Sequence, residues 1–179
     1  MWWSRRPRLR VLAALGFLLA ASCGFTPVYG PGGAAQGLYG DIAVATPSDV
    51  AGYLLVEQLE RRLGQPTGAP RYDLTADIAL SETGLGITPD QETTRIRLLG
   101  RLDYTLTDAT SGALARRGSV QNFTAYSAPV FSAARNTIAG NSVTVQAAED
   151  DAIARLMVIL ADQLVAELLA TAPDWRAGP

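Results

Sequence analysis

Histidine is absent from the 179-residue chain, and cysteine occurs once, at Cys23. Histidine is the commonest general base, and histidine and cysteine are the usual metal ligands and partners in nucleophilic catalysis. The chain also lacks a GxSxG motif, a pair of acids arranged for catalysis and the glycine spacing of a phosphate-binding loop. We therefore expect a protein that is not an enzyme, with no catalytic residue and no metal site.

Lysine is absent as well, so all 15 cations are arginines. Four of them lie before residue 11, whereas all 17 acidic residues lie after residue 22. Residues 23–179 thus carry eleven arginines against 17 acids, a net charge of −6. A domain with this charge has no overall attraction to nucleic acid or to an anionic membrane. We expect no nucleic-acid partner, and an anionic ligand would need a local cluster of arginines.

No apolar stretch reaches the roughly 20 residues that a membrane-spanning helix needs. The stretch from Val11 to Ala21 has 11 residues, follows a basic head and is followed by Ser22 and Cys23. This order is typical of a secretory signal peptide, which we predict over residues 1–22. The alternative is an N-terminal core helix, which the basic head and the turn-rich sequence GFTPVYGPGG disfavour. The basic head consists of Arg5, Arg6, Arg8 and Arg10.

Cys23 stands at the predicted cleavage point, where a lone cysteine of an exported protein has no internal disulfide partner. Its position resembles the bacterial lipobox, in which the cysteine becomes the N-terminus and carries S-diacylglycerol and an N-acyl chain. Several acyl chains are what stable anchoring requires. We predict that Cys23 is lipidated and anchors the protein to the outer membrane on its periplasmic side. A secreted protein with a spare thiol is the alternative.

Residues 23–40 read as the lipidated cysteine and a flexible tether, because glycine and proline are frequent there. We expect a single domain over residues 41–172 and a C-terminal tail over residues 173–179. The domain begins with a short strand at 41–45. The sequence TPSD then opens a helix, with Thr46 as its cap and Asp49 as a capping-box acid, and Gly64 ends it.

Three strands are predicted next, because apolar and polar residues alternate. They cover 72–82, the stretch from Thr93 to 106, and 113–126, with an interruption at 83–92 and a turn at 107–112. A long helix follows over 146–171, with acids in its early turns and Pro173 as its end. Its wide apolar surface indicates either burial on two sides, by the sheet and by a partner, or a generously packed core helix.

This order of elements predicts an α+β fold. Two helices pack on one face of a mixed, mostly antiparallel four-stranded sheet and form a two-layer sandwich. The other face of the sheet stays exposed.

The sequence also resembles the LptE family of outer-membrane lipoproteins that assemble lipopolysaccharide. The resemblance rests on SCGFTPVYG at 22–30, LLVEQLERRL at 54–63, the hairpin at 102–118 and the long stretch at 125–168. It implies an α+β sandwich that plugs the lumen of the LptD β-barrel, helps that barrel to assemble and binds lipopolysaccharide during transfer to the outer leaflet. A generic periplasmic lipoprotein adaptor, or a transport-auxiliary subunit, is the alternative.

The candidate ligand site is a row of arginines on the exposed face of the sheet. Alternation places Arg95, Arg97 and Arg101 on one face, and whichever of Arg116 and Arg117 shares that face extends the row. We expect these side chains to bind the phosphates of lipid A, since guanidinium groups pair with phosphate through two hydrogen bonds. The alternative is an ordinary solvated face neutralised by nearby aspartates.

Overall fold

The computed structural model describes residues 37–87, 93–127 and 142–176, together with Gly30, Gly33 and Ala35. The predicted signal peptide and Cys23 lie outside the described residues. The chain divides into two units, residues 1–36 and 37–179, and the second contains all the described helices and strands. This unit starts before Asp41, because the side chain of Leu38, expected in the tether, is buried.

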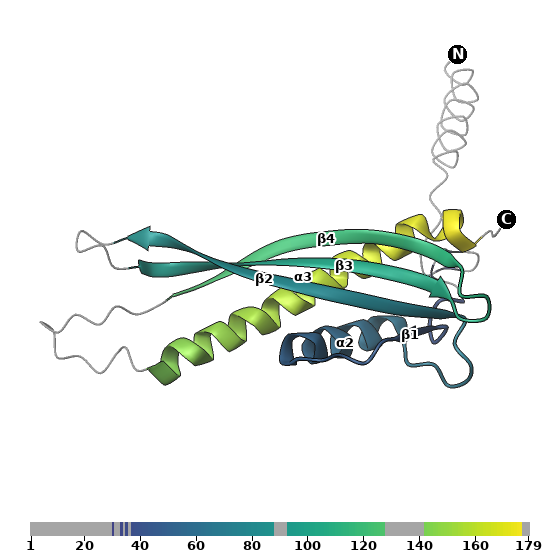
Figure 1. The fold of residues 1–179 in the computed structure, drawn as a ribbon, viewed down its shortest axis with the longest axis horizontal. Coiled ribbons are helices and arrows are strands. Elements are labelled where there is room, and N and C mark those ends of the chain that lie inside the picture. The colour runs from purple at the N-terminus through teal and green to yellow at the C-terminus, as the bar shows by residue number, and fades with distance from the viewer. Residues whose placement is uncertain are drawn as a thin grey trace, which may run out of the picture. The chain divides into compact units, whose positions relative to one another are not determined.

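The second unit has the predicted α+β architecture (Figure 1). A four-stranded sheet has the order β1-β2-β3-β4, in which β1 runs parallel to β2 and the other neighbours are antiparallel. Figure 1 shows both helices on one side of this sheet. The elements are β1 (Ile42–Val44), α2 (Val50–Leu63), β2 (Tyr72–Ile87), β3 (Thr93–Asp108), β4 (Leu114–Ser127) and α3 (Ser142–Arg176).

Helix α2 starts three residues later than the sequence suggested. Asp49, rather than Thr46, is the N-cap, and its carboxylate accepts a hydrogen bond of 2.7 Å from the backbone N–H of Gly52. The prediction of Thr46 was wrong because the charged acceptor of Asp49 satisfies the exposed amide of the first turn. The helix ends as predicted, since Gly64 has a φ of 74°.

The three long strands keep the predicted alternation. On the helix-facing side of β3 the side chains of Leu98, Leu102 and Leu106 are buried, whereas Arg97 and Asp103 on the other side are exposed. The predicted interruption at 83–92 is shorter than expected, because β2 continues to Ile87. The irregularity falls instead at register shifts around Gly84 and Gly86.

Helix α3 is longer than predicted at both ends. It starts at Ser142, so the acids at 149–151 lie beyond the first turn, and Pro173 lies inside it. Proline removes one backbone hydrogen bond but allows the helix to continue when packing compensates. Here Trp175 is buried and its ring meets that of Tyr72 edge-on, with centroids 5.1 Å apart. The expected tail therefore begins with an ordered turn.

The wide apolar surface of α3 is buried on two sides within the chain itself. One side packs on β3 and β4, and the other packs on α2. Arg62 of α2 donates a hydrogen bond to the carboxylate of Asp162 across the two helices. Leu160, Leu164 and Leu168 are fully buried between these layers. No described helix is both long enough and apolar enough to cross a bilayer.

We predict that Trp175→Ala lowers the free energy of unfolding by about 3 kcal/mol, because a buried ring is replaced by a cavity. The neighbouring Asp174 is exposed, so Asp174→Ala is the matched control and should change stability by less than about 0.5 kcal/mol. Urea denaturation measures both. Equal free energies of unfolding for the two variants would show that the turn after Pro173 does not stabilise the fold.

Candidate functional site

The candidate site lies on the side of the sheet that faces away from both helices. We call this side the open face. Among the described elements neither helix covers it, and most of its side chains are exposed. Its members with a charge or a large apolar group are Asp73, Asp77, Arg95, Arg97, Leu99, Arg101, Asp103, Arg117 and Phe123.

Arginines and apolar side chains gather at one end of the open face. Arg95 and Arg97 lie on β3 about 7 Å apart along the strand, at about 3.3 Å per residue. The guanidinium of Arg97 lies over the ring of Phe123, with its carbon 4.4 Å from the ring centroid. Phe123 is directly opposite Leu99 in the register of β3 and β4, and both are exposed. We call these four side chains the basic–apolar patch.

Unlike Arg95 and Arg97, Arg101 forms an ion pair with an aspartate on its own strand. Its Nε and Nη2 donate to the two carboxylate oxygens of Asp103, at 2.9 Å and 2.8 Å. These hydrogen bonds raise the pKa of Arg101 and lower the pKa of the Asp103 carboxyl. The predicted alternative of neutralisation by aspartates therefore applies to Arg101, and Arg101 offers less free charge than Arg95 or Arg97.

Arg116 does not belong to the open face. It is the register partner of the inward-facing Leu106, and its Nη2 lies 3.3 Å from Oε1 of Glu167 on α3. The same carboxylate oxygen accepts a hydrogen bond of 2.7 Å from the hydroxyl of Tyr104. Burial raises the pKa of Tyr104, and the hydrogen bond to Glu167 acts in the same direction. Of Arg116 and Arg117, Arg116 is therefore the one that does not share the face of the predicted row.

Arg117 does lie on the open face, opposite Thr105, but it is remote from the basic–apolar patch. Ala125 of β4 is opposite Arg97, and eight residues separate it from Arg117, which is about 26 Å along the strand. The structure thus brings Arg95 and Arg97 together, keeps Arg101 beside them in an ion pair, and leaves Arg117 apart.

Sequence reasoning missed Leu99 and Phe123. The signal was present, because each interrupts a run of polar residues at the outward positions of its strand. A large apolar residue at such a position lacks a core to enter, and adjacent exposed apolar side chains commonly mark an interaction surface.

Tyr126 forms a hydrogen bond between two strands at the same end of the sheet, on its helix-facing side. Its hydroxyl donates a hydrogen bond of 2.9 Å to Glu82, which lies on β2. Burial of the phenol and this hydrogen bond raise the pKa of Tyr126 to about 12. The contact spans β3 and links β2 to β4 behind the basic–apolar patch.

Two helices on one side of a mixed four-stranded sheet form the fold seen in solved lipoprotein structures. A Caulobacter crescentus protein proposed to be a lipoprotein is 22% identical with a TM-score of 0.61, over 81% of this chain and 99% of that one. Rare lipoprotein B from Shewanella oneidensis is 11% identical with a TM-score of 0.54, over 76% of this chain and 97% of that one. These likenesses confirm the predicted fold class.

Residues 39–168 match the LptE family, described as lipopolysaccharide-assembly, and the match covers well over half of the chain. No curated protein matches the sequence. The chain belongs to the LptE family, which confirms the resemblance seen in the sequence. It therefore belongs to a family that serves lipopolysaccharide assembly.

We predict that the Tyr126 hydroxyl makes stability fall at alkaline pH. The folded-state pKa of about 12 exceeds the unfolded value of about 10, so the contribution is complete below pH 10 and is lost as pH rises from 10 to 12. Tyr126→Phe should reduce the loss between pH 9 and pH 11 by roughly 1 kcal/mol in urea titrations. The exposed Tyr53 supplies the control Tyr53→Phe, which should follow the unmodified protein. If both variants lose as much stability between pH 9 and pH 11 as the unmodified protein, Tyr126 does not titrate as described.

Proposed function

We propose that this protein is a non-enzymatic outer-membrane lipoprotein that binds lipopolysaccharide on its open face. The observation that carries the proposal is the basic–apolar patch, formed by Arg95, Arg97, Leu99 and Phe123 in an otherwise acidic domain. Cys23 carries S-diacylglycerol and an N-acyl chain and holds the protein at the periplasmic side of the outer membrane. Within that membrane it plugs an LptD-like β-barrel and assists its assembly.

The chemistry of the patch suits an anionic glycolipid. Lipid A presents phosphates beside acyl chains, and guanidinium groups bind phosphate through paired, charge-assisted hydrogen bonds. Leu99 is 37% exposed and Phe123 is 51% exposed, so both have apolar surface to lose on contact with an acyl chain. Charge alone would not distinguish lipopolysaccharide from other anions, whereas the combination of charge and apolar surface favours an amphiphile.

Membership of the LptE family supports the partner part of the proposal. A C-terminally tagged protein should co-purify with a large outer-membrane β-barrel protein. Recovery of inner-membrane transporter subunits instead would favour the alternative, a generic periplasmic adaptor or transport-auxiliary subunit. The pull-down therefore tests the barrel partner separately from lipopolysaccharide binding.

We predict that replacing Arg95 and Arg97 together by Gln lowers affinity for lipopolysaccharide about tenfold or more, because two free cations are lost. Both side chains are exposed, so folding should be unchanged. Binding of the unmodified protein should weaken as salt rises. Surface plasmon resonance with immobilised lipopolysaccharide measures each effect.

Arg101→Gln is the matched control, because its charge is already paired with Asp103. Its effect on affinity should be smaller than that of either single change at Arg95 or Arg97. Asp103→Asn should raise affinity by releasing Arg101. An equal loss for all three arginines would assign binding to net charge rather than to the patch, and an unchanged affinity of the double variant would refute the site.

We predict that Cys23 is acylated and becomes the mature N-terminus. Labelled palmitate should enter the unmodified protein in cells and should be absent from Cys23→Ala, which should also leave the membrane fraction. Mass spectrometry of the mature N-terminus locates the modification. Label in the alanine variant, or a mature chain that starts elsewhere, would disprove acylation at this position.

A further inference from the structure

Strand β2 has a long edge without a described neighbour. β1 pairs with β2 only at Tyr72, Asp73 and Leu74. The last hydrogen bond between them runs from the N–H of Ala45 to the carbonyl oxygen of Leu74, at 2.8 Å. The chain then turns away into α2. Beyond Leu74 no described strand pairs with this side of β2.

Backbone groups on this edge point outward at every second residue. The N–H of Tyr72 and the carbonyl of Leu74 face β1, so alternation directs the N–H and C=O groups of Ala76, Ile78 and Leu80 to the same side. An edge of this kind is a template for another extended chain. The stretch from Thr75 to Ser81 spans about 20 Å at about 3.3 Å per residue.

Three of the usual protections of an edge strand are missing over this stretch, while residues 44–49 and the start of α2 lie across a groove from it. It contains no proline, no lysine and no inward-pointing charge, which are the devices that prevent edge pairing. Protection resumes at Glu82, whose side chain points to the helix side, and at the irregular register around Gly84. The other long edge, β4, packs against α3 and carries the inward-pointing Arg116. The open stretch is thus specific to β2.

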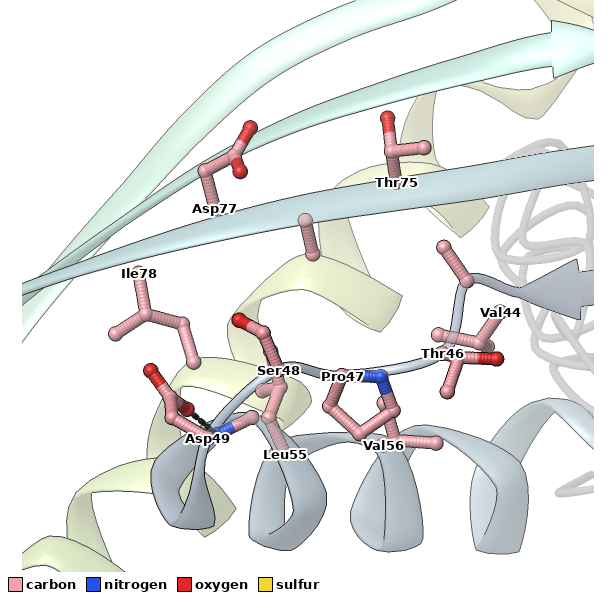
Figure 2. Close-up of a pocket in the computed structure, with 13 residues that line it drawn as sticks. Val44, Thr46, Pro47, Ser48, Asp49, Leu55, Val56, Thr75, Asp77 and Ile78 are labelled. Atoms are coloured by element: carbon pink, nitrogen blue, oxygen red, sulfur yellow. Dashed lines mark hydrogen bonds between the residues drawn. The ribbon is translucent and has the colours of Figure 1, made fainter.

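A groove lies beside this edge, between β2 and the start of α2 (Figure 2). Its volume is about 310 Å³, and its lining includes Val44, Val56 and Ile78. Figure 2 shows Ile78 directed towards α2, while Thr75 and Asp77 point to the other side of β2. An added strand would therefore place alternate side chains in this groove, beside Val56 and Ile78 as well as Ser48 and Asp49, and the others beside Asp77.

The charges around this edge select the kind of strand. Asp73 and Asp77 form no ion pair with any described residue. Asp49 lines the groove. Arg101, which is next to Ala79 in the register, is engaged by Asp103. A second copy of this edge would bring acids against acids, whereas a basic segment would neutralise them.

The geometry points to β-strand addition at this edge, with an extended segment of a partner polypeptide as its occupant. In that segment small apolar residues alternate with basic ones. The apolar residues enter the groove beside Ile78, the basic residues lie next to Asp77, and the backbone pairs with Ala76, Ile78 and Leu80. This interface lies along the sheet edge rather than on the open face, and it is independent of lipopolysaccharide binding.

The experiment uses the full chain and a synthetic peptide of about seven residues in which valine and arginine alternate. Fluorescence anisotropy should detect binding, and hydrogen exchange should slow in the segment that contains Ala76, Ile78 and Leu80. A fully N-methylated peptide, which cannot pair as a strand, should bind at least about tenfold more weakly. A peptide with glutamate in place of arginine should also bind more weakly.

Leu80→Lys and Leu99→Lys form a matched pair, because the two leucines are 38% and 37% exposed. Only the first places an inward-pointing charge on the open edge, so it should weaken peptide binding at least about tenfold while Leu99→Lys leaves it unchanged. Ala76→Pro removes an outward N–H and should act like Leu80→Lys. Circular dichroism checks that each variant folds.

Three results would overturn the proposal. They are the absence of peptide binding to the unmodified protein, equal binding of the N-methylated peptide, and equal effects of the two lysine substitutions. Sedimentation tests the competing occupant, since a dimer of this chain that Leu80→Lys dissociates would assign the edge to self-association. A variant with both Arg95 and Arg97 changed to Gln should keep full peptide affinity, which separates this interface from the lipopolysaccharide site.

Discussion

Helix α3 approaches strand β3 closely at Gly100, where its leucines fill the space beside the glycine. A Cβ atom at this position would lie 2.9 Å from Cδ2 of Leu156 and 3.0 Å from Cδ1 of Leu160, closer than carbon atoms pack. The absence of a side chain lets the helix settle on the sheet and bury its leucines. Because one side of β3 is committed to this contact, every second residue of the strand must point away from it. The open face and its arginines follow from that constraint.

A second close contact, at Gly118, explains why Arg116 is not available on the open face. A Cβ atom at Gly118 would lie 2.6 Å from the Tyr104 hydroxyl and 2.7 Å from Oε1 of Glu167. This glycine leaves room for the hydrogen-bonded group of Tyr104, Glu167 and Arg116 between sheet and helix. One carboxylate oxygen on α3 thereby accepts hydrogen bonds from a buried phenol and from Nη2 of an inward arginine. Arg116 is used for structure, although its neighbour Arg117 points outward.

Sequence patterns predicted the strands and their faces because a period of two is a property of the strand alone. The same patterns predicted both helices and the end of α2, but they misplaced the start of α2 and both ends of α3. The start of α2 depends on which of two candidate caps bonds to Gly52, and the end of α3 depends on Trp175 packing against a residue about 100 positions earlier. The pairing of Arg101 with Asp103 is local, yet it depends on side-chain conformation that alternation does not specify. Register alone revealed that Leu99 meets Phe123.

The two proposed binding surfaces occupy one sheet without mutual interference. Thr83 is the residue of β2 opposite Arg97, and it lies six residues from Asp77, which is about 20 Å along the strand. Exposed charges are screened over about 8 Å at physiological ionic strength, so the basic–apolar patch and the acidic edge act on their ligands separately. An acidic net charge is therefore compatible with an anionic ligand, because screening makes the local arrangement of Arg95, Arg97 and their apolar neighbours decisive. The backbone edge adds a second kind of recognition, in which main-chain hydrogen bonds act together with the charge of Asp77.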